Sequence, residues 1–216
     1  MAEKRRNYQQ FCGVARALDR VGERWTLLIV RNLLLGPRRY SDLLEELPGI
    51  TTNLLAKRLR ELTSAGIVER RVVPSPVRAE LYALSEKGSA LEPVIMELGR
   101  WGGRFMDRPH AHDVVNIGWG LLSMKRRYRG GLELAARFRI DGRCFELVFQ
   151  TNYLSVHERD PTRVDVSVDG SLTSFQRWLF HGEEPSALRA NGSLDVDGSE
   201  EAWGALQRAF APPNAS

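Results

Sequence analysis

Residues 47–66, LPGITTNLLAKRLRELTSAG, decide the fold of the first half of the chain. A Pro-Gly turn leads into a helix predicted from Thr51 to Ser64, and Gly66 closes the helix as a C-cap. At about 100° per residue, this helix has an apolar side and a basic side. A basic helix face is often only a solvated surface, so the neighbouring elements must decide whether it faces an acidic partner.

The elements around this helix follow the order of a winged helix-turn-helix. Two predicted helices, FCGVARALDRVG and RWTLLIVRNLLLG, are followed by a short helix, RYSDLLEEL, with Ser41 as its expected N-cap. Strands predicted over 67–73 and 80–84 form a hairpin, or wing, with the proline-rich tip PSPVRA. In this arrangement the second helix of the pair enters the major groove of DNA.

Helical angles assign roles to the side chains of the basic helix. Its apolar stripe consists of Leu55, Leu59 and Leu62, and the groups suited to base edges, on Asn53 and Lys57, lie roughly opposite. The hydroxyl groups of two threonines lie at the N-terminal end, where a phosphate can bind, and further arginines are phosphate candidates. The predicted DNA-binding residues are Arg38, Arg39, Thr51, Thr52, Asn53, Lys57, Arg58, Arg60 and Arg78.

The last predicted helix of this half carries an apolar stripe without an evident partner. It is expected to begin after Ser85 and to reach about Phe105. Large apolar residues recur along it at spacings of three and four, so this side of the helix must be covered. The stripe consists of Leu91, Ile95, Leu98, Trp101 and Phe105.

These motifs resemble the HxlR family of bacterial transcriptional regulators. The matching landmarks are Cys12, RWTLLIVRNLLLG, RRYSDLLEELPGIT, LAKRLRELTSAGIVERR, YALSEKG and ELGRWG, in order and without large gaps. The resemblance covers residues ~8–105, about half of the chain. It implies a homodimer that binds a palindromic operator in double-stranded DNA, with the terminal helices and their apolar stripe as the dimer interface.

Composition and charge agree with a DNA partner for the first half. The 216 residues are 43% hydrophobic and 27% charged, an ordinary globular mixture that allows one or two domains. Residues 1–112 hold 19 basic and 13 acidic side chains, a net +6, whereas residues 113–216 hold 12 and 14, a net −2. The chain has no stretch of about 18 apolar residues and no apolar signal core at its start. We therefore expect a cytoplasmic protein without a membrane partner.

Cysteines and histidines are the side chains most suited to redox chemistry or metal binding. In some HxlR members the cysteine matching Cys12 senses oxidants or electrophiles, a role that requires a lowered thiol pKa and access. The alternative is a buried structural cysteine. The histidines at 110, 112, 157 and 181 show no metal-ligand spacing. Because no nucleophile with an adjacent base and no glycine-rich phosphate loop is found, we expect no enzyme activity, cofactor or metal.

The second half predicts a small twisted sheet covered by helices. A helix in VVNIGWGLLSMKRRY precedes the strands LELAARFRI and CFELVFQ, joined by Asp-Gly, a strong hairpin signal. RVDVSVDG and GSLDVDG are further strands, and SLTSFQRWLFHG and SEEAWGALQRAF are further helices. Most of the aromatic residues here are expected to form an ordinary core.

The order of these elements resembles the sterol-carrier-protein type of domain. FELVF, the strand with Asp-Val alternation, the strand A-x-G-x-L-x-V-x-G over residues 190–198 and the closing helix carry this resemblance. It implies an apolar tunnel for a fatty acid, an acyl chain or another apolar ligand, because such pockets are mostly apolar. The candidate ligand-binding residues are Phe149, Trp178 and Phe210.

The sequence therefore predicts an α+β protein with two domains. Residues 1–108 form a winged helix-turn-helix domain for DNA binding and dimerisation, and residues 109–216 form a sterol-carrier-like domain. The polar segment DRPHAHD links them. We expect a dimeric DNA-binding regulator modulated by an apolar ligand. Two alternatives remain open: a thiol switch at Cys12, and a lipid carrier with an accessory helical domain.

Overall fold

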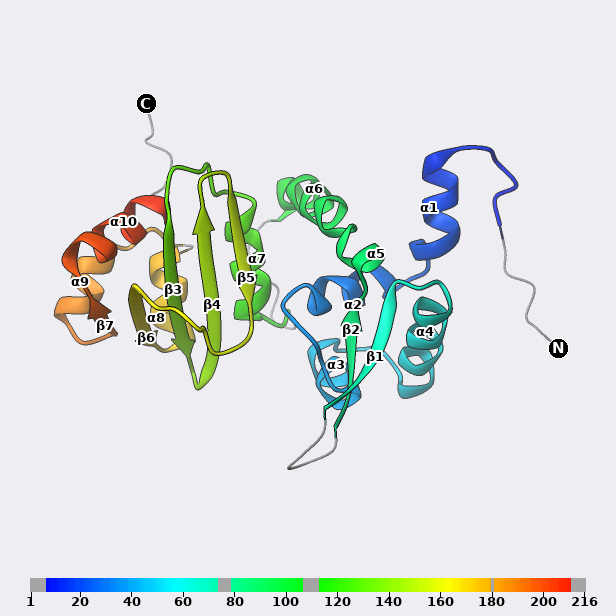
Figure 1. Ribbon diagram of the computed structural model, residues 1–216, viewed down its shortest axis with the longest axis horizontal. Helices are drawn as coiled ribbons and strands as arrows, with labels where there is room; N and C mark the ends of the chain where they lie inside the picture. Colours follow the sequence, from blue (N-terminus) through cyan, green and yellow to red (C-terminus); the bar gives the residue numbers. More distant parts are fainter. Residues whose placement is uncertain (1–6, 74–78, 107–112, 180, 211–216) are drawn as a thin grey trace. The chain divides into compact units, whose positions relative to one another are not determined.

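The chain folds into two compact units, residues 1–114 and residues 115–216. The computed structural model describes residues 7–73, 79–106, 113–179 and 181–210 (Figure 1). The expected linker lies largely outside these ranges, and the division falls a few residues after the expected boundary at 108. Both units combine helices with a sheet, so the fold is α+β as predicted. Within the described ranges, no helix has the length and apolar character to cross a bilayer.

The N-terminal unit consists of helices packed against a hairpin. Its core is made by apolar residues from α2, α3, α4 and the hairpin, among them Ile29, Leu43 and Leu55, each 0% exposed. The hairpin strands are antiparallel, with Arg70 opposite Tyr82. The elements are α1 (Gly13–Val21), α2 (Thr26–Leu33), α3 (Tyr40–Glu46), α4 (Thr52–Ser64), β1 (Val68–Val73), β2 (Ala79–Leu84), α5 (Glu86–Ser89), α6 (Glu92–Gly102) and the 3-10 turn η1 (Gly103–Phe105).

Both ends of α4 follow from the residues placed there. Thr51 is the N-cap, and its hydroxyl accepts a hydrogen bond from the N–H of Leu54 at 3.3 Å. At the other end Gly66 has φ +69°, a left-handed conformation that glycine adopts without steric cost. The N–H groups of Gly66 and Ile67 bond to the carbonyls of Thr63 and Leu62, which forms a Schellman motif. The predicted end of this helix at Ser64 is confirmed, and the helix begins one residue after the predicted start, with Thr51 as its cap.

Two predicted helix boundaries in this unit are wrong. Helix α3 begins one residue before Ser41, and Asp42 instead accepts a hydrogen bond from the N–H of Arg39 at 3.0 Å. The helix expected to run without a break to Phe105 is divided, because Ser85 caps only the single-turn helix α5. Helix α6 then begins anew with Pro93 in its first turn, a position where proline's missing N–H costs no hydrogen bond.

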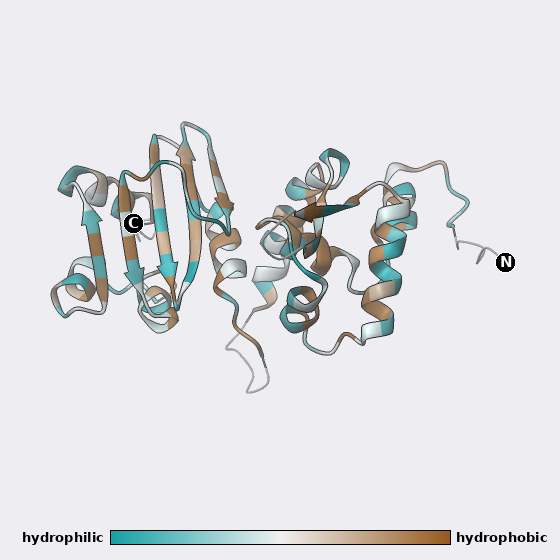
Figure 2. Cartoon of the chain, turned by 60° about the horizontal axis from the view of Figure 1, so that its bottom comes forward, coloured by the Kyte–Doolittle hydropathy of each residue, from teal (hydrophilic) through white to brown (hydrophobic). Residues whose placement is uncertain are grey.

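The C-terminal unit is a five-stranded sheet with the strand order β5-β4-β3-β6-β7. The central pair, β3 and β6, is parallel, and the other pairs are antiparallel. Figure 2 shows apolar and polar residues alternating along its strands. The elements are α7 (Ile117–Lys125), β3 (Leu134–Ile140), β4 (Arg143–Gln150), β5 (Tyr153–His157), β6 (Val166–Gly170), α8 (Leu172–Leu179), α9 (Pro185–Ala190), β7 (Leu194–Gly198) and α10 (Glu200–Phe210).

The predicted hairpin at Asp141-Gly142 is present between β3 and β4. Both residues have positive φ, +46° and +81°, as a type I′ turn requires. One face of the sheet is apolar, and Phe138 and Phe145 on it are fully buried. Phe175 of α8 covers this face, with its ring centroid 5.0 Å from that of Phe138. Strand β5 and helix α9 were not predicted.

Candidate nucleic-acid interface

Helix α4 presents a polar stripe on the side opposite its core residues. Leu55, Leu59 and Leu62 are at most 1% exposed, whereas Asn53 and Arg60 are exposed. Thr51 and Thr52 are exposed at the N-terminal end, and Lys57 is partly exposed between Asn53 and Arg60. The structure thus divides α4 into the two sides that the helical angles predict. Amide, ammonium, hydroxyl and guanidinium groups share one surface along about three turns.

Arg58 does not belong to this surface, contrary to prediction. Only 8% of the residue is exposed. Its guanidinium pairs with Glu23 at 2.7 Å and with Glu61 at 2.5 Å, and its Nε donates to the carbonyl of Arg24 at 3.3 Å. The two carboxylates and the carbonyl hold the side chain against the segment before α2. A phosphate would have to displace these partners, so Arg58 is a structural residue.

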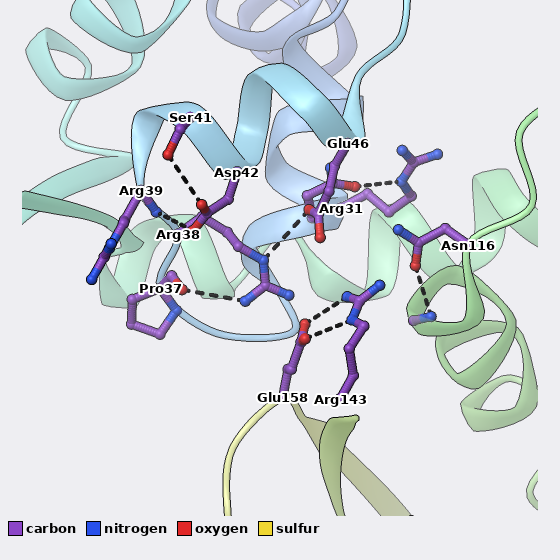
Figure 3. Close-up of polar contacts among 12 residues, drawn as sticks. Arg31, Pro37, Arg38, Arg39, Ser41, Asp42, Glu46, Asn116, Arg143 and Glu158 are labelled. Carbon is purple, nitrogen blue, oxygen red and sulfur yellow. Dashed lines mark hydrogen bonds and ion pairs between the residues drawn. The ribbon is translucent and has the colours of Figure 1, made fainter. Parts of the chain in front are cut away.

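Arg38 is also turned inward, which corrects its assignment as a phosphate contact. It is 6% exposed, and its guanidinium lies 3.4 Å from Glu46 and 3.2 Å from the carbonyl of Pro37 (Figure 3). Burial lowers the pKa of the Arg31 guanidinium in α2 to about 10, and the negative charge of Glu46 acts in the opposite direction. Arg38 exchanges two backbone hydrogen bonds with Tyr82 of the wing, at 2.9 and 2.7 Å. Arg38 therefore joins α3 to the base of the wing.

Arg39 keeps its expected place on the surface. Its side chain is exposed at the start of α3. The neighbouring Ser41 is also exposed, and its hydroxyl donates to Asp42 at 3.1 Å (Figure 3). Asp42 accepts a hydrogen bond from the N–H of Arg39, and among the described residues the Arg39 guanidinium shows no ion pair with a carboxylate. Arg39 remains a cation available to an anionic partner.

The wing carries two arginines that sequence reasoning did not select. Arg70 and Arg71 of β1 have side chains about half exposed, 51% and 55%. Arg70 pairs with Glu80 at 3.0 Å and lies 5.6 Å from the ring centroid of Tyr82, and Arg71 pairs with Glu69 at 2.7 Å. Glu80 reaches Arg70 diagonally across the hairpin, and Glu69 lies two residues before Arg71 on the same strand, so both arginines are ion-paired. Arg78, predicted at the wing tip, lies outside the described residues.

Cys12 is exposed, so its interpretation as a buried structural cysteine is wrong for this chain. It is the N-cap residue of α1. The backbone N–H groups of Ala15 and Val14, in the first turn of α1, lower the pKa of its thiol because they favour the thiolate. By contrast, burial and the neighbouring Asp160 raise the pKa of Cys144 to about 11. Within the described residues, no group of His, Cys, Asp and Glu side chains is arranged to hold a metal ion.

The predicted apolar stripe lies on the surface of the N-terminal unit. Leu91 and Ile95 pack partly against its core. Leu98, Trp101 and Phe105 are 45%, 60% and 68% exposed, and the rings of Trp101 and Phe105 stack edge to face at 4.9 Å. Helix α6 buries none of its residues fully. Exposed groups of large apolar side chains are typical of interaction surfaces.

The three predicted ligand residues meet in the C-terminal unit. The ring of Phe210 lies 5.6 Å from that of Phe149 and 5.9 Å from that of Trp178, measured between centroids. Phe149 and Trp178 are 1% and 5% exposed, so these side chains fill the space between the sheet and the helices. Trp178 and Phe210 also line an open cavity of about 210 Å³ beside the loop before α9.

Comparisons with known proteins identify relatives of the N-terminal unit. The HxlR-like helix-turn-helix family model matches residues 20–110. The chain is 41% identical to the HTH-type transcriptional regulator YvaP of Bacillus subtilis over 93 residues, 43% of this chain and 85% of YvaP. It is 40% identical to the regulator YodB of the same organism over 91 residues, 42% of this chain and 81% of YodB. The solved structure of the redox regulator HypR in its oxidised form matches with a TM-score of 0.42 and 32% identity, over 44% of this chain and 99% of HypR.

Proposed function

Because the chain belongs to the HxlR-like helix-turn-helix family of transcriptional regulators, we propose that it binds double-stranded DNA with α4 in the major groove. The polar stripe of α4 carries this proposal. An exposed amide, a partly exposed ammonium and a guanidinium lie on one side of the helix, and three buried leucines hold the other side in the core. A helix presented in this way matches the dimensions of the major groove.

The exposed groups divide between base reading and phosphate binding. Asn53 and Lys57 have the donors that base edges accept, and they lie in the first two turns of α4. Arg39 and Arg60 flank them and serve phosphates, together with the hydroxyls of Thr51 and Thr52 at the helix N-terminus. Arg78 at the wing tip is proposed as a further phosphate contact. Arg38 and Arg58 are left out of this set, because their guanidinium groups are bound within the fold.

The experiment is selection of duplexes from a random-sequence pool, followed by titration at several salt concentrations. The selected duplex should bind more tightly than its scrambled version, and affinity should fall as salt rises, since phosphate contacts release counterions. Lys57→Ala should weaken base discrimination. Arg39→Ala should weaken binding to all sequences alike and reduce the salt slope, which is the slope of log affinity against log salt concentration, by about one. Affinity that stays flat with salt would refute phosphate binding.

We further propose that two copies associate through the apolar stripe from Leu91 to Phe105 and bind a palindromic operator. The stripe leaves large aromatic side chains in water in the single chain, and burial against a second copy would remove this cost. A twofold dimer presents two copies of α4, which a palindrome matches.

For the C-terminal unit we propose a sensor role toward a fatty acid, an acyl chain or another apolar molecule, as in the sterol-carrier-like domains it resembles. The aromatic side chains of Phe149, Trp178 and Phe210 support this idea, since their rings converge between the sheet and the helices. Because these rings fill the space themselves, ligand entry requires α10 to move. Native mass spectrometry of gently purified protein tests the proposal: a mass that corresponds to the bare chain alone speaks against it.

A second candidate mechanism places the switch at Cys12. The observation that favours it is the exposed thiol at the N-terminus of α1, whose pKa the backbone N–H groups lower. Oxidation or alkylation of this thiol would then alter DNA binding. Cys12→Ser should bind the selected duplex normally and lose any response to an oxidant or an electrophile. A response that persists in Cys12→Ser would exclude this mechanism.

A further inference from the structure

The N-terminal turn of α4 is tied to α3 by one side chain outside the DNA-binding set. The hydroxyl of Tyr40, the first residue of α3, donates a hydrogen bond to the carbonyl oxygen of Thr52 at 2.6 Å. Thr52 is the first residue of α4 and precedes Asn53, the first proposed base reader. The bond therefore joins the two helices at the end of α4 that would approach the bases.

The ring of Tyr40 is well placed to act as a fixed support. Tyr40 is partly buried and packs against the apolar core of the unit. The turn that links α3 to α4 is held separately, by a hydrogen bond from the N–H of Ile50 to the carbonyl of Leu47 and by the ring of Trp25 close to Gly49. These contacts fix where the chain enters α4. The Tyr40 bond adds a second point of attachment, so it limits how the first turn can tilt.

The same hydroxyl is poorly suited to bind DNA directly. A phenol has one hydrogen to donate, and a phosphate oxygen can only accept. The hydrogen of Tyr40 is already donated to Thr52. Contact with a phosphate would break the attachment of α4, so the hydroxyl serves either the helix or the DNA, and the geometry favours the helix.

We propose that Tyr40 is a positioning residue that sets the orientation of α4 and thereby determines base discrimination through Asn53. This inference rests on the proposed DNA binding by α4. Base reading depends on donors placed within about 0.5 Å of their productive positions. Loss of the Tyr40 bond should leave the phosphate contacts of Arg39 and Arg60 in place and reduce the advantage of the selected sequence over others.

The test compares wild type, Tyr40→Phe, Asn53→Ala and the double variant on a duplex selected by the wild type and on its scrambled version. Tyr128→Phe is the matched control. It removes a hydroxyl that donates to the carbonyl of Gln150 and accepts from the N–H of Leu132 in the other unit. Tyr40→Phe should reduce the ratio of the two affinities roughly three- to tenfold, the range for one hydrogen bond, with an unchanged salt slope. Tyr128→Phe should leave the ratio as it is.

Each outcome has a distinct meaning when all titrations are made at a temperature where every variant is folded. If Tyr40 acts through Asn53, the double variant should discriminate no worse than Asn53→Ala alone. Equal discrimination by Tyr40→Phe and wild type, or additive losses in the double variant, would overturn the positioning role. A salt slope reduced by about one would instead make Tyr40 a phosphate contact. If the wild type selects no sequence at all, the proposed DNA binding itself fails.

Discussion

At the scale of single residues, Arg58 and Arg60 show how two similar side chains on one helix differ in role. We expect Arg58→Ala to lower the free energy of unfolding by about 1–3 kcal/mol, since its charged hydrogen bonds to Glu23 and Glu61 are lost in a nearly buried site. Arg60→Ala, at an exposed position, should change stability by no more than about 0.5 kcal/mol and should weaken DNA binding. Urea denaturation and duplex titration measure the two effects.

The two variants should differ in opposite ways: Arg58→Ala should lose stability, and Arg60→Ala should lose DNA affinity. Measured below its unfolding transition, Arg58→Ala should retain most of its dependence of DNA affinity on salt. A strong loss of salt slope in Arg58→Ala, together with unchanged stability, would restore Arg58 to the DNA-binding surface. Arg60→Lys is a useful addition, because it keeps the charge and should preserve most of a simple phosphate contact.

The two cysteines should separate by pH in an alkylation experiment. The rate of reaction with iodoacetamide follows the thiolate fraction. The backbone N–H groups of Ala15 and Val14 lower the pKa of Cys12, so its rate should reach half-maximum at a lower pH than that of an ordinary thiol. Burial raises the pKa of Cys144 to about 11, so Cys144 should react only in strong alkali. Mass spectrometry of Cys144→Ala and Cys12→Ser gives each rate separately; equal profiles would contradict the assignment.

The sequence predicted residue roles well where helical geometry alone decides them. The positions of Leu55, Leu59 and Leu62 follow from a period of 3.6, and their burial confirms the angles. The inward turn of Arg38 and Arg58 did not follow, because Glu46 and Glu23 lie eight and 35 residues away along the chain, and the local partner Glu61 alone would leave Arg58 on the helix surface. A long-range ion pair leaves no local pattern. The same limit applies to Tyr40 and Thr52.

At the scale of elements, the C-terminal end of α4 depends on one glycine. Gly66 has φ +69°, and a Cβ there would meet no atom within 4 Å, so only backbone strain opposes a side chain. We expect Gly66→Ala to destabilise the N-terminal unit by about 1 kcal/mol. Gly13→Ala is the control: a Cβ there also meets nothing, and φ is ordinary at the start of α1. A midpoint of thermal unfolding for Gly66→Ala that equals or exceeds that of Gly13→Ala would disprove the argument.

Long elements with caps could be predicted from sequence, and short ones could not. Helix α4 has a threonine cap, a regular apolar stripe and a glycine stop. Strand β5 has five residues and buries only Leu154 and Val156, and helix α9 has six residues. Segments of this length gain their stability from tertiary contacts rather than from local preference. The break before α6 was missed because the apolar stripe continues across it.

At the scale of the whole molecule, the two units differ in what can be inferred from them. The N-terminal unit has an exposed polar stripe on α4 and an exposed apolar stripe on α6, so the two proposed partners, DNA and a second copy, would use separate surfaces. The aromatic residues of the C-terminal unit point inward. The same side chains therefore form its core and the proposed ligand site. Mutation of Phe149 or Trp178 would therefore remove core and candidate site together, and direct detection of a bound molecule is the better experiment.

The last prediction concerns the assembly of two copies through the apolar stripe from Leu91 to Phe105. If two copies associate through it, Trp101→Glu places a charge in the middle of the interface and should weaken association by more than about tenfold, as expected for an aromatic residue at such a centre. Arg100→Glu is the control, since Arg100 lies on the other side of α6 and pairs with Glu97. Sedimentation velocity should show a dimer for wild type and Arg100→Glu and a monomer for Trp101→Glu. The monomer should also bind a palindromic duplex more weakly, since it engages one half-site at a time. A dimer that survives Trp101→Glu would place the interface elsewhere.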